Sequence, residues 1–418
     1  MQTHFFANTF AALRSRNFRY FWTGQCISVM GTWIQRTSQT WLVYQMTKSA
    51  FLVGLLAACQ FLPLLGLTLI AGGTLIDRFP KRTLLLITQC GFLVLGALMT
   101  LIVYFKVVQY WQILAIAFGM GILQSFDTPT RQSFVVELVG KKDLLNGISL
   151  NSSIFNLAKI AGPALAGILM VQFGITWCFF INTVSYLAVI FGLARIENIP
   201  AVIQTHKRPQ MLRDILAGIH YVLSHSELKL VATMMLIIST LNFNNNVIIP
   251  IYAEEVLHAG SQTYANLLSA TGIGSLAAAF IMSYLARYGL NRRLYLVVSF
   301  GTMLLQSLML FVRSFWLASV IMILLGFCNM IFLNQSNASF QVGIPHELRG
   351  RIMSVYVLLN QGTTPPLGSL YVGAVMDLAA GSWGGFPACG LLALFLVSVV
   401  LLVQRKIIAN WIFPAKAK

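Results

Sequence analysis

The sequence predicts an all-α membrane protein with twelve transmembrane helices, arranged as two pseudo-symmetric bundles of six helices. Three observations predict this fold: an apolar composition, twelve apolar segments of membrane-spanning length, and basic residues that gather on one side of those segments. Of the 418 residues, 57% are hydrophobic and only 9% are charged. An ordinary soluble domain has about 25% charged residues. The composition therefore excludes a soluble enzyme, a disordered chain and a DNA-binding domain.

The apolar segments each approach the length of about 20 residues that a membrane-spanning helix requires. Glycine, proline and clusters of charge separate one segment from the next. We expect the helices near residues 19–46, 50–76, 84–105, 110–127, 146–171, 175–195, 230–252, 262–286, 294–312, 315–340, 351–377 and 386–404.

The longest polar stretch, residues 196–229, divides these segments into two sets of six. It includes an amphipathic piece from Met211 to His225, a pattern typical of a helix at the membrane interface. Pairs of similar residues 210 positions apart, such as Glu137-Leu138 and Glu347-Leu348, indicate duplicated halves. The predicted domains are an N-terminal bundle over 1–195, a cytoplasmic linker with an amphipathic helix over 196–229, and a C-terminal bundle over 230–418. Parallel halves of this kind place a substrate site between them, near mid-membrane.

The net charge of +17 reflects 28 basic and 11 acidic residues. When the segments alternate across the membrane, most basic residues fall on the side that holds both termini. Only Lys48, Lys106 and Arg313 fall on the opposite side, and Arg36 and Lys159 lie inside helices. Because basic residues are retained in cytoplasmic loops, this asymmetry predicts that both termini are cytoplasmic.

Residues 73–82 read Gly-Thr-Leu-Ile-Asp-Arg-Phe-Pro-Lys-Arg and resemble the loop signature G-x-L-x-D-R-x-G-R-R of the major facilitator superfamily. Pro80 replaces the usual second glycine. The resemblance implies the major facilitator fold and a charge network at the cytoplasmic face that locks the outward-open state. The second copy of the motif has Arg287 where the aspartate belongs, so its contribution to the gate is expected to be smaller. The gate residues implied are Gly73, Asp77, Arg78, Lys81, Arg82, Arg131 and Glu137.

Further stretches, including 127–139, 151–167 and 347–354, are similar to the bacterial exporters of the transmembrane secretion effector type, a subgroup that includes the enterobactin exporter. The similarity extends over about the whole chain. It implies a bacterial inner membrane protein that works by alternating access and expels small molecules such as siderophores or drugs, usually by proton antiport. The partners expected are a small-molecule substrate, protons and the lipid bilayer, with no nucleic acid and no cofactor, and the chain is expected to be monomeric.

Two basic residues within helices are the main candidates for substrate binding, because charge at mid-membrane is costly and usually functional. Arg36 and Lys159 each share a helix face with polar residues, so they could form a positively charged pocket for an anionic solute. Alternatively, they tie helices together through carbonyl groups or Asp127. The candidate substrate-binding residues are Gln25, Thr32, Arg36, Gln39, Asn156 and Lys159 in the first half, and Asn242, Asn245, Asn334, Asn360 and Gln361 in the second.

The amides of the second half could bind carboxylates, hydroxyls or catechols, or they could join helices. Pro365-Pro366 should break the eleventh helix locally. Asp127 is the candidate for proton coupling, and a structural ion pair with Arg131 one turn away is the alternative. Glu254 and Glu255, at the periplasmic end of the seventh helix, are expected to be solvated.

We therefore expect a secondary active exporter of an anionic or polyhydroxylated small molecule, with a siderophore as the first choice. The alternatives are a multidrug/proton antiporter, a lysophospholipid flippase and, from another class, a non-transporting membrane receptor or assembly factor. The chain has no GxxxxGK[ST], HExxH or GxSxG motif, and its six cysteines form no CxxC pair. We expect neither an enzyme nor a metal site.

Overall fold

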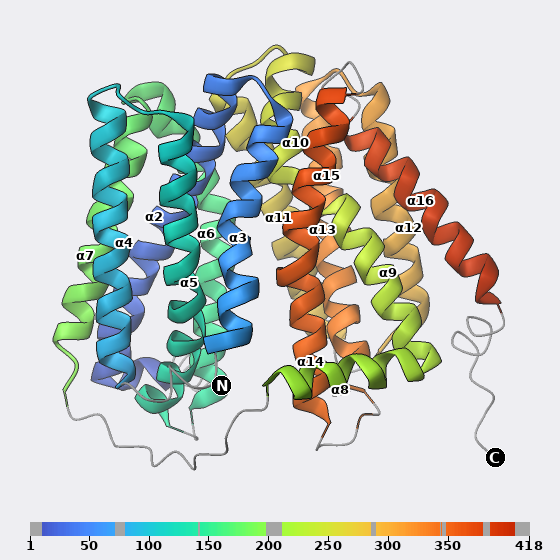
Figure 1. The fold of residues 1–418 in the computed structure, drawn as a ribbon, viewed down its shortest axis with the longest axis horizontal. Coiled ribbons are helices and arrows are strands. Elements are labelled where there is room, and N and C mark those ends of the chain that lie inside the picture. Colours follow the sequence, from blue (N-terminus) through green and yellow to red (C-terminus); the bar gives the residue numbers. More distant parts are fainter. Residues whose placement is uncertain are drawn as a thin grey trace, which may run out of the picture. The chain divides into compact units, whose positions relative to one another are not determined.

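The computed structural model describes residues 11–71, 80–140, 143–197, 211–285, 290–342, 344, 348–378 and 385–405, and its regular structure within these ranges is entirely helical (Figure 1). Eight of the described helices are long and apolar enough to cross a membrane. The other predicted segments, 19–46, 50–76, 110–127 and 351–377, are also helical over their described parts. The predicted all-α membrane fold is therefore confirmed.

By their contacts, the residues form two compact units. Unit 1 comprises Met1–Leu42 and Leu62–Pro209, and unit 2 comprises Val43–Phe61 and Gln210–Lys418. The segment Val43–Phe61 therefore packs with the second unit, although it belongs to the first six predicted helices.

The helices of unit 1 follow the predicted apolar segments closely. One helix is longer than predicted: the fourth segment was expected to end near residue 127, but its helix continues to Val139 and includes Arg131. Pro129 lies inside it, so packing overrides the usual helix-breaking effect of proline. The elements are a 3-10 helix Ala11–Arg14, α2 Arg16–Thr47, α3 Ala50–Ala71, α4 Lys81–Tyr104, α5 Tyr110–Val139, α6 Leu144–Gln172 and α7 Ile175–Ala194; the end of α2 and the start of α3 group with unit 2.

The described helices of unit 2 include two π-helical stretches and one 3-10 turn. They are α8 Met211–Ser224, α9 Ser226–Asn242, α10 Asn245–Ile251, a π-helical turn Tyr252–Val256, α11 Ser261–Leu285, α12 Arg292–Leu308, a 3-10 turn Met309–Phe311, α13 Phe315–Ser339, α14 Arg349–Val357, a π-helical segment Leu358–Thr363, α15 Thr364–Leu378 and α16 Gly385–Val403.

The seventh predicted helix is broken rather than continuous. Between α9 and α10, Phe243 and Asn244 leave the helical conformation. Two side chains accommodate the break: Gln306 Nε2 donates a hydrogen bond to the carbonyl oxygen of Asn242 (3.0 Å), and Asn244 Nδ2 donates to that of Thr240 (2.5 Å). The carbonyl groups that a break releases are thus partly satisfied.

The eleventh predicted helix is irregular, as expected, but just before its prolines. The π-helical segment ends at Thr363, and Pro365 and Pro366 lie in the first turn of α15. Proline is tolerated in a first turn because the amide groups there have no partner within the helix. The prolines therefore begin the second half of this helix.

The amphipathic helix of the linker is present as α8. Figure 1 shows it lying across the end of α14, and a Cβ atom at Gly218 would meet the carbonyl oxygen of Arg351 at 2.4 Å. Only glycine allows the two backbones to come this close.

Candidate functional site

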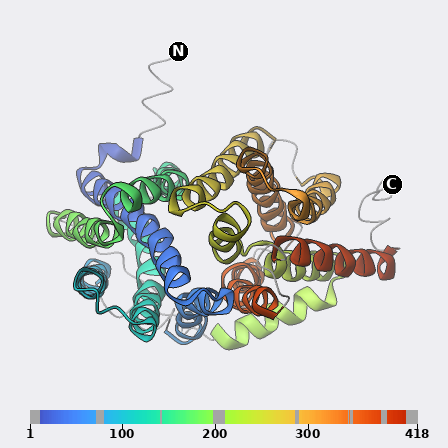
Figure 2. The ribbon, with the colours of Figure 1, turned by 90° about the horizontal axis from the view of Figure 1, so that it is seen from above.

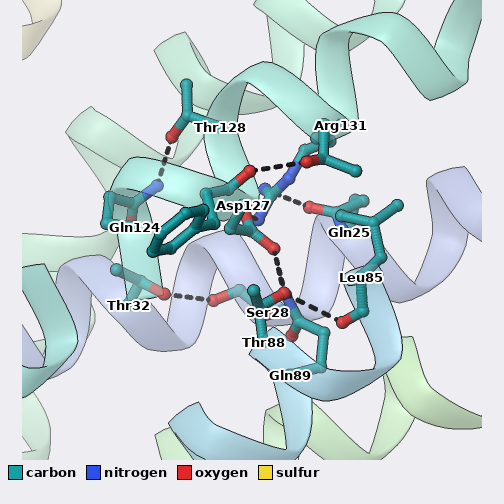
Figure 3. A network of polar contacts seen from close by, with 12 residues as sticks. Gln25, Ser28, Thr32, Leu85, Thr88, Gln89, Gln124, Asp127, Thr128 and Arg131 are labelled. Carbon is teal, nitrogen blue, oxygen red and sulfur yellow. Dashed lines mark hydrogen bonds and ion pairs between the residues drawn. The ribbon is translucent and has the colours of Figure 1, made fainter. Parts of the chain in front are cut away.

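A buried polar network joins α2, α4 and α5 in unit 1 (Figure 3). Its centre is Asp127, whose exposed fraction is 0%. Gln89 Nε2 and Thr88 Oγ1, both from α4, donate hydrogen bonds to Asp127 Oδ1 at 2.8 and 3.1 Å. Arg131 pairs with Asp127 Oδ2 and donates a second hydrogen bond to Gln25 Oε1 on α2. Both carboxylate oxygens therefore have donors.

The ion pair arises from the register of α5, because residues four apart lie one above the other on a helix. A structural ion pair between Asp127 and Arg131 is the alternative to proton coupling that their spacing in the sequence predicts. A buried carboxylate persists only when it is paired and hydrogen-bonded, and here the required donors come from neighbouring helices. The network can thus hold α2, α4 and α5 together, and Asp127 is the carboxylate at its centre.

Arg36 and Lys159 lie on two helices that pack closely in unit 1. Val29 on α2 packs with Ile154 and Ala158 on α6, and Ile34 packs with Ala166, so the two helices run in the same direction. A Cβ atom at Gly162 on α6 would meet Trp33 Cβ at 2.4 Å, so the glycine is needed for this approach. We call this contact between the two helices the α2–α6 seam.

The two basic side chains lie on either side of the level at which the α2–α6 seam is tightest. Lys159 is three residues before Gly162, and Arg36 is three residues after Trp33, so each shares a face with the residue at the contact. Six residues at the helical rise separate their levels by about 9 Å along the helix axes. This spacing suits two anionic groups of one small molecule.

Neither basic side chain is neutralised within the part of the chain that the structure describes. Among the described residues, no carboxylate lies within ion-pair distance of Arg36 or Lys159. Arg36 is half-buried with its guanidinium 5.9 Å from the centre of the Trp33 ring, and Lys159 is exposed. The donors of Asp127 are Thr88, Gln89 and Arg131, so Asp127 is not the partner of either residue.

The other candidates in unit 1 differ in availability. Gln25 is occupied by Arg131, and Thr32 Oγ1 donates to the carbonyl oxygen of Ser28 (2.9 Å). Gln39 is buried, and its Nε2 has no hydrogen-bond partner among the described residues. Asn156 is half-buried, one turn from Lys159 on α6.

The gate residues that the structure describes make three separate sets of contacts. Lys81 Nζ and Glu137 Oε1 form an ion pair at 2.5 Å that links α4 to α5. Arg82 donates to the carbonyl oxygens of Leu193 and Ala194, both at 2.8 Å, and so satisfies the end of α7. The expected gate residue Arg131 instead joins the Asp127 network. Gly73, Asp77 and Arg78 lie outside the described residues.

The amides of unit 2 are spread over several helices. Asn242 is fully buried, and neither polar atom of its side chain has a hydrogen-bond partner among the described residues. Asn245 is half-buried, and its Oδ1 accepts no hydrogen bond from the residues that the structure describes, whereas Asn334 is exposed. Asn360 lies in the π-helical segment, which packs against α9, and the side chain of Gln361 is outside the described set.

Some polar residues that join these helices could not be identified from the sequence. Thr88 and Gln89 hold Asp127, but a single threonine and glutamine in an apolar segment give no signal of their partner. The same is true of Asn182 on α7, whose Nδ2 donates to Gln35 Oε1 on α2 (2.5 Å). The described residues contain no group of three or more His, Cys, Asp or Glu that could hold a metal ion.

The expectation that Glu254 and Glu255 are only solvated is wrong. Tyr44 Oη donates a hydrogen bond to Glu255 Oε1, and Lys48 Nζ pairs with Glu254 Oε1, both at 2.5 Å. These contacts form because the end of α2 packs with unit 2, which no local pattern in the sequence indicates.

Comparison with known proteins gives a consistent result. The family model for transmembrane secretion effectors matches residues 7–410. The staphyloferrin A transporter of Staphylococcus aureus is 24% identical over 393 residues, which are 93% of this chain and 96% of the relative. The multidrug efflux pump Tap of Mycolicibacterium fortuitum is 26% identical over 375 residues, with 87% and 90% covered. The enterobactin exporter of Shigella boydii is 22% identical over 404 residues, with 93% and 92% covered.

Among solved structures, the nucleoside transporter NupG resembles the chain with a TM-score of 0.73 at 10% identity. The match covers 93% of this chain and 98% of that structure. At this identity the likeness establishes the fold alone, and that fold is the one transporters of the major facilitator superfamily adopt.

Proposed function

Because the chain belongs to the transmembrane secretion effector family of the major facilitator superfamily, we propose that it exports an anionic or polyhydroxylated small molecule, with a siderophore as the first choice, by proton antiport. The family consists of secondary transporters of small molecules, so the chain is a multi-pass membrane transporter and not an enzyme. The observation that carries the proposal is the pair Arg36 and Lys159, which flanks the α2–α6 seam without a carboxylate partner among the described residues.

The chemistry of the pair suits an anion. Lysine and arginine form charge-assisted hydrogen bonds with carboxylates and other oxyanions, and these are about twice as strong as neutral ones. Uncompensated positive charge inside a membrane is also costly, so an anionic ligand offsets a real penalty. The relatives named for staphyloferrin A and enterobactin support a siderophore as the first substrate to test.

The proposal includes an orientation and a cycle. Both termini lie in the cytoplasm of a bacterium, the chain crosses the inner membrane as a monomer, and two bundles over 1–195 and 230–418 alternate in access. The ion pair Lys81–Glu137 and the loop residues Gly73, Asp77 and Arg78 then belong to the cytoplasmic gate. The basic loops on the side of the termini support this orientation.

Transport into inside-out vesicles tests the substrate. Arg36→Gln and Lys159→Gln should each raise the KM for an iron-free siderophore on the order of tenfold, because a lost charged hydrogen bond of about 1.4 kcal/mol is tenfold in affinity. Lys106→Gln is the matched control, since Lys106 is an exposed lysine in the loop after α4. Unchanged KM in both variants would rule out the pair as the binding site.

Proton coupling is assigned to Asp127, because it is the carboxylate at the centre of the buried network. When it takes up a proton, the negative charge that pairs with Arg131 is lost, and the link between α5 and α2 through Gln25 weakens. Asp127→Asn should therefore abolish transport driven by a pH gradient but leave substrate counterflow, which needs no net proton movement. Glu227→Gln, which neutralises a carboxylate in an exposed ion pair, is the control. Gradient-driven transport by Asp127→Asn would assign coupling elsewhere.

A multidrug/proton antiporter is the second candidate, favoured by the 26% identity to the multidrug efflux pump Tap. It would carry lipophilic cations, which Arg36 and Lys159 disfavour because neither has a carboxylate partner in the described part of the chain. Drug susceptibility of a deletion strain separates the two functions: hypersensitivity to cationic drugs with unchanged siderophore secretion would favour the antiporter.

A further inference from the structure

Three carboxylates of unit 2 are bonded to one short stretch of chain. Glu254 and Glu255 lie in the π-helical turn after α10, and Asp377 lies in the last turn of α15. Within the described part of the chain, their hydrogen-bond and ion-pair partners lie in residues 44–51, where α2 ends and α3 begins, and this stretch groups with unit 2. The contacts are Tyr44 with Glu255, Gln45 and Lys48 with Glu254, and Ser49, Ala50 and Phe51 with Asp377.

Asp377 and Ser49 together satisfy the start of α3. The backbone amides of Ala50 and Phe51 donate to Asp377 Oδ1 and Oδ2 at 2.8 and 3.1 Å, and the amide of Leu52 donates to Ser49 Oγ at 3.2 Å. Ser49 Oγ in turn donates to Asp377 Oδ2 (2.5 Å). The first amides of a helix have no partner within it, so the carboxylate of another helix supplies what α3 lacks.

The position of Asp377 within its own helix is unfavourable. A negative charge in the last turn of a helix opposes the helix macrodipole, whereas a negative charge at the start of a helix is favoured. Asp377 stands at the end of α15 and at the start of α3 at once. Its charge is therefore stabilised by the contact with α3 and not by α15.

Close backbone packing accompanies these hydrogen bonds. A Cβ atom at Gly54 would meet the carbonyl oxygen of Ser369 at 2.3 Å, and one at Gly373 would meet that of Ala50 at 2.7 Å. Glycines on both helices thus bring α3 and α15 into contact, and Figure 2 shows the first part of α3 (blue) beside α15 (red-orange). The fit is specific to this arrangement of the two helices.

The contacts of Glu254 and Glu255 contribute less to this arrangement than those of Asp377. Lys48 and Glu254 form an ion pair with 52% and 31% of their side chains exposed, and exposed pairs contribute little. The bond from the buried Tyr44 to Glu255 is better shielded from solvent. Asp377, which accepts three hydrogen bonds, is the residue on which the arrangement chiefly depends.

We propose that these contacts form a latch that must open during transport, with Asp377 as its main positioning residue. The carboxylate latch is defined as Tyr44, Gln45, Lys48, Ser49, Ala50 and Phe51 together with Glu254, Glu255 and Asp377. The inference rests on the proposed function: α2 and α3 are each divided between the two units, so alternating access by the two proposed bundles would draw the joined ends of these helices away from unit 2 in one of the two end states. Neutralising Asp377 shifts the resting protein toward the state in which this segment is released.

A spin-label measurement tests the latch without substrate. Nitroxides at Phe51→Cys and Leu378→Cys, in purified full-length protein whose six native cysteines are replaced, report the separation of α3 from α15. Both native side chains are exposed, at 39% and 85%. The continuous-wave spectrum should show dipolar broadening, and Asp377→Asn should reduce the broadened fraction. Glu255→Gln should reduce it less, and Glu227→Gln, in the exposed ion pair with Arg292, should leave it unchanged.

A reversible lock tests whether the latch opens during transport. In Ser49→Cys with Asp377→Cys, a short bis-methanethiosulfonate reagent should join the two side chains and stop transport, and dithiothreitol should restore it. In each single variant, the reagent should leave the transport rate equal to the rate of the same variant without reagent.

The outcomes separate the latch from the proposed function. A broadened fraction unchanged by both Asp377→Asn and Glu255→Gln overturns the latch, as does normal transport by the cross-linked protein. A spectrum that changes as expected in a protein that carries no siderophore supports the latch and refutes the siderophore substrate.

Discussion

At the residue scale, Asp127 is the feature on which the first unit most depends. It is fully buried, and its donors come from its own helix and from α4, while Arg131 also reaches α2. Removing one partner of a buried ion pair costs about 3–5 kcal/mol, because it leaves an uncompensated buried charge. Removing both charges costs much less.

This asymmetry gives a stability prediction. Arg131→Leu should lower the free energy of unfolding by about 3 kcal/mol or more, and the double variant Asp127→Asn with Arg131→Leu should be more stable than the single one. Thermal unfolding in detergent, followed by tryptophan fluorescence, compares the three proteins. A single variant as stable as the wild type would show that the pair is not structural.

The spacing of Asp127 and Arg131 predicted their ion pair, because both lie on one helix. The partners Thr88 and Gln89 could not be predicted, since their contact with α5 depends on how α4 and α5 pack. The same limit explains why Glu254 and Glu255 were expected to be solvated. Contacts within a helix are encoded locally, and contacts between helices are not.

At the scale of the element, glycines determine which helices touch. Gly274 on α11 and Gly326 on α13 pack against each other's helix: added Cβ atoms would meet the carbonyl oxygens of Ile323 and Thr271 at 1.8 and 1.9 Å. Gly301 on α12 is different, because among the described residues an added Cβ atom would come within 4 Å of Cys328 Sγ alone, at 3.5 Å.

Alanine substitution should therefore act in opposite directions at these sites. Gly274→Ala should destabilise unit 2, because backbone on the neighbouring helix would have to move. Gly301→Ala should be neutral or stabilise it by up to about 1 kcal/mol, the helix propensity difference between glycine and alanine. The melting temperatures of the two variants check this, and equal shifts would contradict the proposed tight contact of α11 and α13.

The broken helices show which irregularities can be predicted from the local sequence and which cannot. Pro365-Pro366 predicted an irregular eleventh helix, and the π-helical segment lies directly before them. The break after Asn242 was not predicted, because it is stabilised by Gln306 from another helix. The run of asparagines at 244–246 is a local sign of this break, but amides in such a run equally suit ligand binding.

At the scale of the whole molecule, the fold class follows from composition and from the spacing of apolar segments. Both depend on the membrane as solvent rather than on particular contacts, so they can be read without a structure. The candidate site is less accessible to such reasoning. Arg36 and Lys159 were found because charge within apolar segments is rare, but their arrangement about Gly162 depends on the α2–α6 seam.

The central claim, that this basic pair binds an anionic substrate, is tested most directly by equilibrium binding to purified protein. Titration with an iron-free siderophore, followed by calorimetry, gives the Kd of the wild type, Lys159→Gln and Lys106→Gln. We predict that Lys159→Gln weakens binding on the order of tenfold, that Lys106→Gln binds as the wild type does, and that salt weakens wild-type binding more than that of Lys159→Gln. Equal Kd values for Lys159→Gln and the wild type would contradict the account.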